Sequence, residues 1–249
     1  MDRLGEEIKK LARLIEESSY TVVLTGEGIA KGGGLTGFNN PGNMLPKMID
    51  PDDFSIGSFK NNPAGFYEAG APYFDILEQI EPNKVHTGLA DLEKRGLVKA
   101  IITQNIDGLH QKAGAKNVFE IHGTLRTASC VQCDLQFETE ALLAGGKEKP
   151  PVPLCPECGE PLKPDVVLAG EPPPPDYHQA ADEIKKADLM VIIGSGVDTS
   201  PADQLPLNQK NLAIINQSPT EYDQQAKVVI RENPVEVIQL LLEEINGRS

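Results

Sequence analysis

Four cysteines, arranged as two closely spaced pairs, are the side chains whose type and spacing most directly indicate chemistry. The pairs are Cys130-x-x-Cys133 and Cys155-x-x-Cys158, with 21 residues between them, and the sequence has no other cysteine. Four thiolates at this spacing are typical of a structural zinc ribbon. Disulfides are the alternative, but paired cysteine knuckles in a reducing compartment favour zinc. Because four thiolates fill its coordination sphere, zinc would stabilise a small module without binding a catalytic water.

A glycine turn after a short apolar segment is the second candidate site. Residues 20–25 are mostly apolar or β-branched, and Gly26-Glu27-Gly28-Ile29 follows them. A strand that runs into such a turn and then a helix is how a dinucleotide-binding unit begins, since backbone N–H groups can face a pyrophosphate there. Many strand-to-helix turns are rich in glycine for steric reasons alone. The turn by itself therefore leaves nucleotide binding open.

Charge and length exclude several classes of protein. The chain has 249 residues, with 23 Lys+Arg against 37 Asp+Glu and a net charge of −14, so no dense basic stripe favours nucleic acid as a partner. No apolar run reaches the ~18–20 residues that span a bilayer, and the first residues lack the pattern of a secretory signal. We expect a soluble, acidic, cytoplasmic protein, built as one large domain with inserts or as a large and a small lobe.

The spacing of apolar residues predicts alternating helices and strands, whose turns and ends position the candidate sites. Helices are expected over 2–18, 84–95, 176–187 and 234–246, and strands over 20–25, 98–103, 118–121, 166–168, 189–193, 212–216 and 228–230. This alternation predicts an α/β fold with a mostly parallel sheet wound on both faces. Such sheets bind ligands beyond the C-terminal ends of their strands, where polar residues cluster in this sequence.

Residues 32–80 differ from the rest of the chain in composition: they are rich in glycine, proline and asparagine and hold most of the aromatic residues. We interpret this segment as a helical insertion with an entry loop. Its aromatic side chains would form either a satellite core or a substrate-facing groove between two lobes.

Five segments follow one another along the chain: the Gly26-x-Gly28 turn, Thr103-Gln104-Asn105-Ile106-Asp107-Gly108-Leu109-His110, Glu120-Ile121-His122-Gly123, the two cysteine pairs and Gly170-Glu171. In this order they resemble the motifs of the sirtuin family of NAD-dependent protein deacylases. Gly194-Ser195-Gly196, Pro201-Ala202 and Asn216 fit the last nucleotide motifs of the family. The resemblance implies a Rossmann-type lobe over about 1–31, 84–126 and 162–249. It also implies a small lobe made of a helical insertion over about 32–83 and a zinc ribbon over about 127–161.

The resemblance also implies roles for individual residues. His122 would be the base that acts on a ribose hydroxyl after the acyl oxygen has displaced nicotinamide, since a histidine with an ordinary pKa near ~6.5 is neutral enough to accept a proton. Gln104 and Asn105 would contact the nicotinamide ribose and a water. Asp107 would contact the nicotinamide carboxamide, and helix capping is a second interpretation of Asp107 that is compatible with the first.

The products would be free lysine, nicotinamide and O-acyl-ADP-ribose, formed in a cleft that takes NAD from one side and an acyl-lysine peptide between the lobes. The peptide would bind by strand addition along Val167–Glu171. The implied site comprises His122, Asn105 and Gln104 for catalysis; Gly26, Glu27, Gly28, Ile29, Phe38, Gln104, Asn105, Ile106, Asp107, Gly194, Ser195, Gly196 and Asn216 for the cofactor; and Val167, Ala169, Gly170 and Glu171 for the substrate. No chemistry is assigned to the other histidines: His86 is expected to pack or cap a helix, and His178 to be exposed.

The first motif departs from the family pattern of Gly-Ala-Gly-Ile-Ser followed by Ser-Gly-Ile-Pro-Asp-Phe-Arg. The corresponding runs here are Gly26-Glu27-Gly28-Ile29-Ala30 and Gly33-Gly34-Leu35-Thr36-Gly37-Phe38-Asn39. A carboxylate at Glu27 would repel a pyrophosphate by on the order of 4 kcal/mol at ~4 Å and an effective dielectric constant of about 20. Asn39 in place of arginine would remove roughly 1.5–3 kcal/mol of charge-assisted hydrogen bonding, which Lys31 could partly offset.

These departures leave three functions open. The first is the deacylase, and the second is an NAD glycohydrolase or ADP-ribosyltransferase that cleaves nicotinamide without capturing an acyl group. The third is a module that binds acyl-lysine or a nucleotide without turnover, in which Glu27→Ala with Asn39→Arg would restore NAD cleavage. Separately, Ala169 stands where the family has a bulky aromatic residue, which predicts tolerance of acyl groups longer than acetyl unless a neighbour fills the space.

Overall fold

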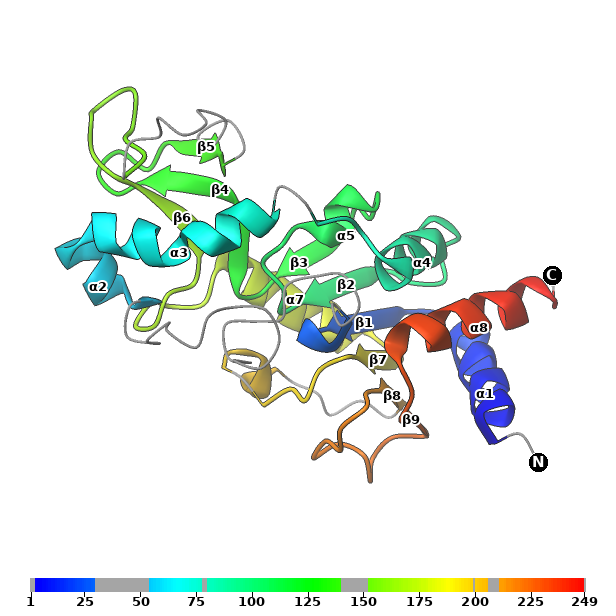
Figure 1. The fold of residues 1–249 in the computed structure, drawn as a ribbon. Coiled ribbons are helices and arrows are strands. Elements are labelled where there is room, and N and C mark those ends of the chain that lie inside the picture. Colours follow the sequence, from blue (N-terminus) through cyan, green and yellow to red (C-terminus); the bar gives the residue numbers. More distant parts are fainter. Residues whose placement is uncertain are drawn as a thin grey trace.

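A six-stranded parallel sheet forms the centre of the protein in the computed structural model, which describes residues 3–29, 54–77, 80–139, 152–198, 200–205 and 211–248. The strand order is β3-β2-β1-β7-β8-β9, and every neighbouring pair is parallel (Figure 1). The strands are β1 (Thr21–Thr25), β2 (Ala100–Thr103), β3 (Val118–Glu120), β7 (Leu189–Ile193), β8 (Leu212–Ile215) and β9 (Val228–Ile230). The predicted α/β fold with a parallel sheet is confirmed.

Helices cover both faces of this sheet and divide its core in two. On one face, α1 (Arg3–Glu17), α4 (Lys84–Lys94) and α8 (Pro234–Asn246) bury apolar side chains against Val23 and Val191. On the other face, α7 (Pro175–Lys186) packs near Val22 and Leu24. Because successive residues of a strand point to opposite faces, β1 contributes to both cores, and its five residues are all buried. The sheet is therefore wound on both faces, as the sequence predicts.

Helix α4 begins at a capping box that also contacts the glycine turn. The Asn83 side chain accepts the N–H of Val85 at 2.9 Å, and His86 Nδ1 accepts the N–H of Asn83 at 3.2 Å. The capping role expected for His86 is confirmed. Asn83 Nδ2 also donates to the carbonyl of Ile29 at 2.7 Å, at the end of the short 3₁₀-helix η1 (Glu27–Ile29). One side chain thus joins the start of α4 to the chain that leaves β1.

A second, three-stranded antiparallel sheet lies beside the first, with the order β5-β4-β6. Its strands are β4 (Gly123–Cys130), β5 (Gln136–Glu138) and β6 (Leu162–Val166), and the helices α2 (Ile56–Asn61) and α3 (Pro63–Leu77) lie next to it, away from α1 and α8 (Figure 1). Phe59, Phe66 and Tyr67 pack with apolar residues of β4 and of the end of β6. These aromatic side chains form the satellite core that was one of the two interpretations of the insertion.

The prediction of a parallel-sheet strand over residues 166–168 is wrong. The structure ends β6 at Val166 and places it in the antiparallel sheet, not in the parallel one. Beyond it, the N–H of Val167 donates to the carbonyl of His122 at 2.8 Å, and the backbone turns at Gly170, where φ is +91°. The apolar run in the sequence reflects burial of Val166 and Leu168 against the aromatic helices. Such burial has the same local signature as a central strand.

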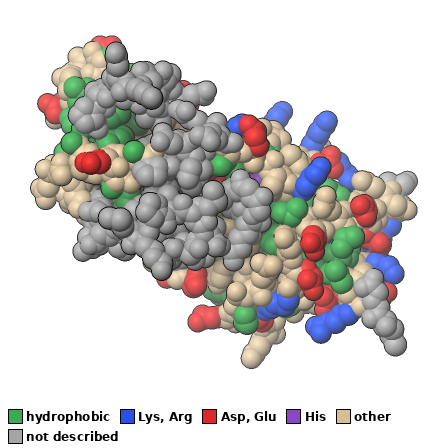
Figure 2. All heavy atoms as spheres, in the orientation of Figure 1, with side chains coloured by type: hydrophobic (Ala, Val, Ile, Leu, Met, Phe, Trp, Pro, Cys, Tyr) green, Lys and Arg blue, Asp and Glu red, His purple; other side chains and the backbone are tan. Residues whose placement is uncertain are grey.

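The remaining described elements are α5 (Leu109–Lys112) and η4 (Ala202–Gln204). Among the described residues, we find no helix whose length and hydropathy would let it cross a bilayer. In the view of Figure 2, basic side chains of the described residues are scattered among acidic ones over the end formed by α1, α4 and α8, without a continuous basic stripe on that face.

Gly28, in the turn after β1, must be a glycine because the backbone at Gly194, after β7, lies against it. The N–H of Gly28 donates to the carbonyl of Gly194 at 2.8 Å, and a Cβ on Gly28 would lie 2.7 Å from both Cα and O of Gly194. Gly194 has a φ of +65°, which glycine adopts without strain. The steric interpretation of this motif is therefore sufficient to explain Gly28, whatever ligand the turn binds.

We predict that Gly28→Ala lowers the free energy of unfolding by ~1–3 kcal/mol, because two backbones would have to separate to admit the methyl group. Urea unfolding followed by circular dichroism measures the change. Gly57→Ala in α2 is the matched control, since its Cβ would meet only Ser55 Oγ at 3.7 Å. Equal unfolding midpoints for wild type and Gly28→Ala would contradict the close backbone contact.

Candidate active site and metal centre

The C-terminal ends of β1, β2 and β7 bring three predicted motifs together. The N–H of Gln104, just after β2, donates to the carbonyl of Thr25 at 2.9 Å, and the N–H of Gly26 donates to the carbonyl of Ile193 at 3.2 Å. Ser195 Oγ, just after β7, donates to Gln104 Oε1. The glycine turn, the glutamine motif and the Gly194–Gly196 motif therefore meet at one edge of the sheet, where parallel sheets bind ligands.

His122 lies at this edge, after β3, with its ring held by the neighbouring loop. Its Nδ1 is 3.0 Å from the carbonyl oxygen of Gln104, which can only accept, so Nδ1 carries the proton. Its Nε2 is buried and has no hydrogen-bond partner among the described residues. Burial lowers the pKa of His122, and the hydrogen bond that Nδ1 donates to the Gln104 carbonyl opposes this shift. The imidazole is thus neutral near pH 7, with an available lone pair on Nε2.

Asn105 and Asp107 occupy the loop between β2 and α5. The side-chain Nδ2 of Asn105 is buried without a partner in the described part of the chain, and its backbone N–H donates to Thr103 Oγ1 at 3.1 Å. Asp107 accepts the N–H of Leu109 at 2.9 Å through Oδ1. Burial raises the pKa of Asp107 to about 6, and the nearby Glu120 carboxylate adds to this rise. Asp107 therefore accepts an N–H of the first turn of α5, while Gly108 holds the N-cap position, and the contact of Asp107 with a carboxamide stays a prediction.

An ion pair between the buried Glu120 and the partly exposed Arg126, which sequence analysis missed, supports this loop. Glu120 is 5% exposed, and its Oε2 lies 3.0 Å from Nη2 of Arg126 on β4. The aliphatic part of Arg126 covers Gly108, where a Cβ would collide with it and where φ is +70°. Burial raises the pKa of Glu120 and Arg126 opposes the rise. No local signal distinguishes Arg126, because a lone arginine in a strand is usually a solvated surface residue.

Two further histidines form a buried pair behind the turn. The rings of His86 and His110 lie 4.8 Å apart between centroids, and His110 Nε2 is 2.9 Å from Thr25 Oγ1. Burial lowers the pKa of His86 to about 4 and that of His110 to about 3. Both rings are therefore neutral near pH 7 and pack against the end of β1. His178 on α7 is exposed, as expected.

The other residues implied for the cofactor lie on the same edge or outside the described ranges. Glu27 and Ile29 lie in η1, and Ile29 is fully buried. Asn216 follows β8, beside the carbonyl of Ile215 that accepts the N–H of Gly194, and its Nδ2 donates to the carbonyl of Ser218 at 2.9 Å. Phe38 and Asn39, with the whole run from Ala30 to Asn39, lie outside the described residues.

The segment implied for the peptide joins His122 to the helical insertion. Besides the contact of Val167 with His122, the N–H of Ala169 donates to the carbonyl of Phe54 at 3.1 Å, and the N–H of Ile56 donates to the carbonyl of Ala169 at 3.0 Å. Ala169 and Gly170 are exposed. This segment therefore presents surface directly beside the residue with the free base nitrogen.

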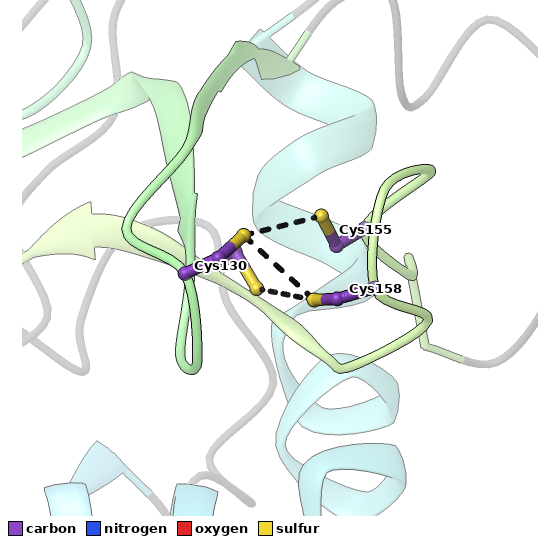
Figure 3. Close-up of side chains that lie close together, drawn as sticks. Cys130, Cys155 and Cys158 are labelled. Atoms are coloured by element: carbon purple, nitrogen blue, oxygen red, sulfur yellow. Dashed lines mark hydrogen bonds between the residues drawn. The ribbon is translucent and has the colours of Figure 1, made fainter.

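The four cysteine side chains converge from two loops of the small sheet. All four Sγ atoms lie within 4.8 Å of one another. The Sγ atoms of Cys130 and Cys158 are 3.3 Å apart, and Cys133 Sγ is 3.7 Å from the Sγ atoms of both Cys155 and Cys158. Figure 3 shows the labelled side chains pointing toward one another. A tetrahedral ion with Zn–S bonds of ~2.3 Å separates its sulfurs by ~3.8 Å. The arrangement fits one zinc ion, as the spacing of the cysteines predicts.

Comparison with known proteins finds one family throughout. Residues 42–201 match the model of the Sir2 family. NAD-dependent protein deacetylase 2 of Caldanaerobacter subterraneus subsp. tengcongensis is 41% identical over 225 residues, covering 90% of each chain. The NAD-dependent protein deacetylase of Sulfolobus acidocaldarius is 39% identical over 246 residues, covering 97% of this chain and 95% of that protein.

Solved structures agree with the sequence relatives. Sir2Tm bound to a propionylated peptide superposes with a TM-score of 0.83 at 34% identity, covering 97% of this chain and 99% of that one. Sir2 in complex with a p53 peptide and NAD+ gives a TM-score of 0.84 at 35% identity, with the same coverage. The similarity therefore includes both sheets and the helices between them.

We predict that the protein binds one zinc ion per chain and that Cys155→Ser abolishes binding, since a buried ligand would be lost and metal binding is coupled to folding. Metal analysis measures the stoichiometry, and hydrogen exchange should show β4–β6 losing protection before β1 and β7. Leu135→Ser is the control, because this exposed side chain, in the loop that carries Cys133, offers no ligand. Full metal removal without a change in protection would contradict a structural zinc.

We predict that His122 titrates below the ordinary value near ~6.5, since burial disfavours the imidazolium. The base then stays mostly neutral as the pH falls through 6.5. Because the unfolded chain binds this proton more strongly, the contribution of His122 to stability is full above its unfolded pKa and is lost as the pH falls toward the folded pKa. Proton NMR of the ring, assigned with His122→Asn, gives the midpoint, and a value at or above 6.5 would contradict the burial argument.

Proposed function

The chain belongs to the Sir2 family, and we propose on that premise that it is an NAD-dependent protein-lysine deacylase releasing nicotinamide and O-acyl-ADP-ribose. The observation that carries the proposal is the state of His122: Nδ1 is bound to the Gln104 carbonyl, and the buried Nε2 is left without a partner among the described residues. A buried polar atom without a partner is costly, and at the C-terminal edge of a parallel sheet a bound ligand would remove that cost.

NAD, when bound, supplies a ribosyl carbon that gives up nicotinamide and takes the acyl oxygen. Two unpartnered buried atoms on one loop edge, His122 Nε2 and Asn105 Nδ2, fit its hydroxyl groups as acceptor and donor. His122 would take a proton at Nε2. Asp107, with a pKa raised to about 6, would meet the carboxamide. The turn residues Gly26–Ile29, with Phe38, Gln104, Ile106, Gly194–Gly196 and Asn216, complete the proposed binding set.

The proposed peptide site is the segment Val167–Glu171, between a large lobe and a small lobe with the boundaries given above. Its position between His122 and Phe54 supports this, because a peptide lying there would pass beside the backbone of His122. A related structure contains a propionylated peptide. The small, exposed Ala169 supports acceptance of acyl groups longer than acetyl. We place the protein in the cytoplasm, where thiolate zinc sites and NAD are both maintained.

We predict that incubation with NAD and an acetyl-lysine peptide releases one acetyl group per nicotinamide, detected with O-acetyl-ADP-ribose by mass spectrometry. His122→Ala should lower kcat by about 10²–10⁴-fold, the usual contribution of a positioned base. His178→Ala, an exposed residue of α7, is the matched control. Propionyl and butyryl peptides test the Ala169 hypothesis, which fails if acetyl is always the best substrate.

Other outcomes would select the other functions. Cleaved NAD with an intact peptide would indicate a glycohydrolase or an ADP-ribosyltransferase. Binding without turnover at millimolar NAD would indicate a non-catalytic module, an outcome favoured by the carboxylate of Glu27 in η1. If Glu27→Ala with Asn39→Arg then restored NAD cleavage, the departures of the first motif from the family pattern would be the cause of the lost turnover.

A further inference from the structure

Lys163, on β6, turns its ammonium group into the protein. Its side chain is 15% exposed, and Nζ lies 2.9 Å from the carbonyl of Pro164, 2.9 Å from that of Val166 and 3.1 Å from Glu171 Oε2. An ammonium has three protons and no acceptor capacity. These three contacts therefore use its full donor capacity within the chain, which is unusual for a residue that most often reaches into water.

Glu171 completes the arrangement from the other end of the turn. Its Oε2 also accepts the N–H of Leu168 at 2.8 Å, while its own N–H donates to the carbonyl of Leu168 at 2.9 Å. The side chain is 20% exposed. This carboxylate therefore closes the reverse turn that contains Gly170, and one of its oxygens is already engaged with two donors of the same chain.

The segment held in this way is the one that contacts both sides of the site. Val167 is hydrogen-bonded to the backbone of His122, and Ala169 exchanges backbone hydrogen bonds with Phe54 and Ile56 at the start of α2. Lys163 holds the carbonyls just before this segment, and Glu171 holds its last turn. The ion pair spans the segment and fixes both of its ends.

We propose that Lys163, paired with Glu171, is a positioning residue for the acyl-lysine peptide. The pair holds the backbone of Val167–Ala169 in its observed path between His122 and Phe54, beside which the peptide would lie, and Lys163 itself does not touch the substrate. Without the ammonium, two carbonyls lose a donor and a partly buried carboxylate loses its partner, so the segment relaxes. The inference rests on the proposed deacylase function and assigns Glu171 to the turn in place of a direct substrate contact.

Lys163→Met tests the proposal, because it keeps an unbranched apolar stem and removes all three donors. With NAD saturating, we predict a rise of about tenfold or more in KM for the acetyl-lysine peptide, and a KM for NAD within about twofold of wild type. Lys163→Arg should restore most of the peptide affinity, since a guanidinium can donate to the same acceptors. Lys185→Met is the matched control, as it removes an exposed pair with Asp182 on α7.

Two further measurements keep the outcome decisive. Zinc content and urea unfolding show whether Lys163→Met is folded. If it is not, Glu171→Gln, which keeps an acceptor for Leu168 and loses the charge, should raise the same KM by a smaller factor. In the double variant Lys163→Met with Glu171→Ala, the increases in peptide KM should not add, because each substitution alone already breaks the same ion pair.

The results separate this inference from the function it rests on. A wild-type protein that deacylates, together with a Lys163→Met variant whose peptide KM is unchanged or whose two KM values rise equally, would overturn the positioning role alone. If wild type binds a fluorescent acetyl-lysine peptide without turnover, its Kd replaces KM and the same tenfold difference is expected. If wild type neither turns over nor binds the peptide, both the proposed function and the role of Lys163 are wrong.

Discussion

The contact between the backbones of Gly28 and Gly194 sets the geometry on which the site depends. It holds the turns after β1 and β7 so close together that neither could carry a side chain on the facing side. Gln104 and Ser195 then meet above this contact and are hydrogen-bonded to each other. A sheet buried on both faces makes this possible, since its strands cannot slide without exposing one of two apolar cores.

At this edge of the sheet, some polar atoms form hydrogen bonds within the protein and others have no hydrogen-bond partner. The Gln104 carbonyl satisfies Nδ1 of His122, and Leu109 satisfies one oxygen of Asp107. Nε2 of His122 and Nδ2 of Asn105 stay buried without partners in the described ranges. Folding normally avoids such atoms because they lose water without gaining a hydrogen bond. Because these two atoms lie on neighbouring loops at the edge where parallel sheets bind ligands, we treat that edge as a ligand site.

The small sheet has little apolar core of its own and relies on three different supports. Four thiolates gather at one end, aromatic side chains of α2 and α3 pack at the other, and Lys163 with Glu171 holds the chain that leaves β6. Each support acts on a different part of the path from the metal centre to Val167. The position of the proposed peptide segment relative to His122 therefore depends on the whole small sheet and not on one contact.

Sequence alone determined the features that neighbouring residues specify. The strand Leu189–Ile193 and the helix Pro234–Asn246 have strong periodicity, the four cysteines have a spacing that suits zinc, and the motifs from Gly26 to Asn216 lie in the order of the family. Only the tertiary structure decided that Val166 ends a strand of the antiparallel sheet, that Gly28 is required by Gly194, which nitrogen of His122 is free and that the Glu171 carboxylate points inward. Each of these depends on a partner distant in the chain, and local periodicity carries no information about which distant groups will meet.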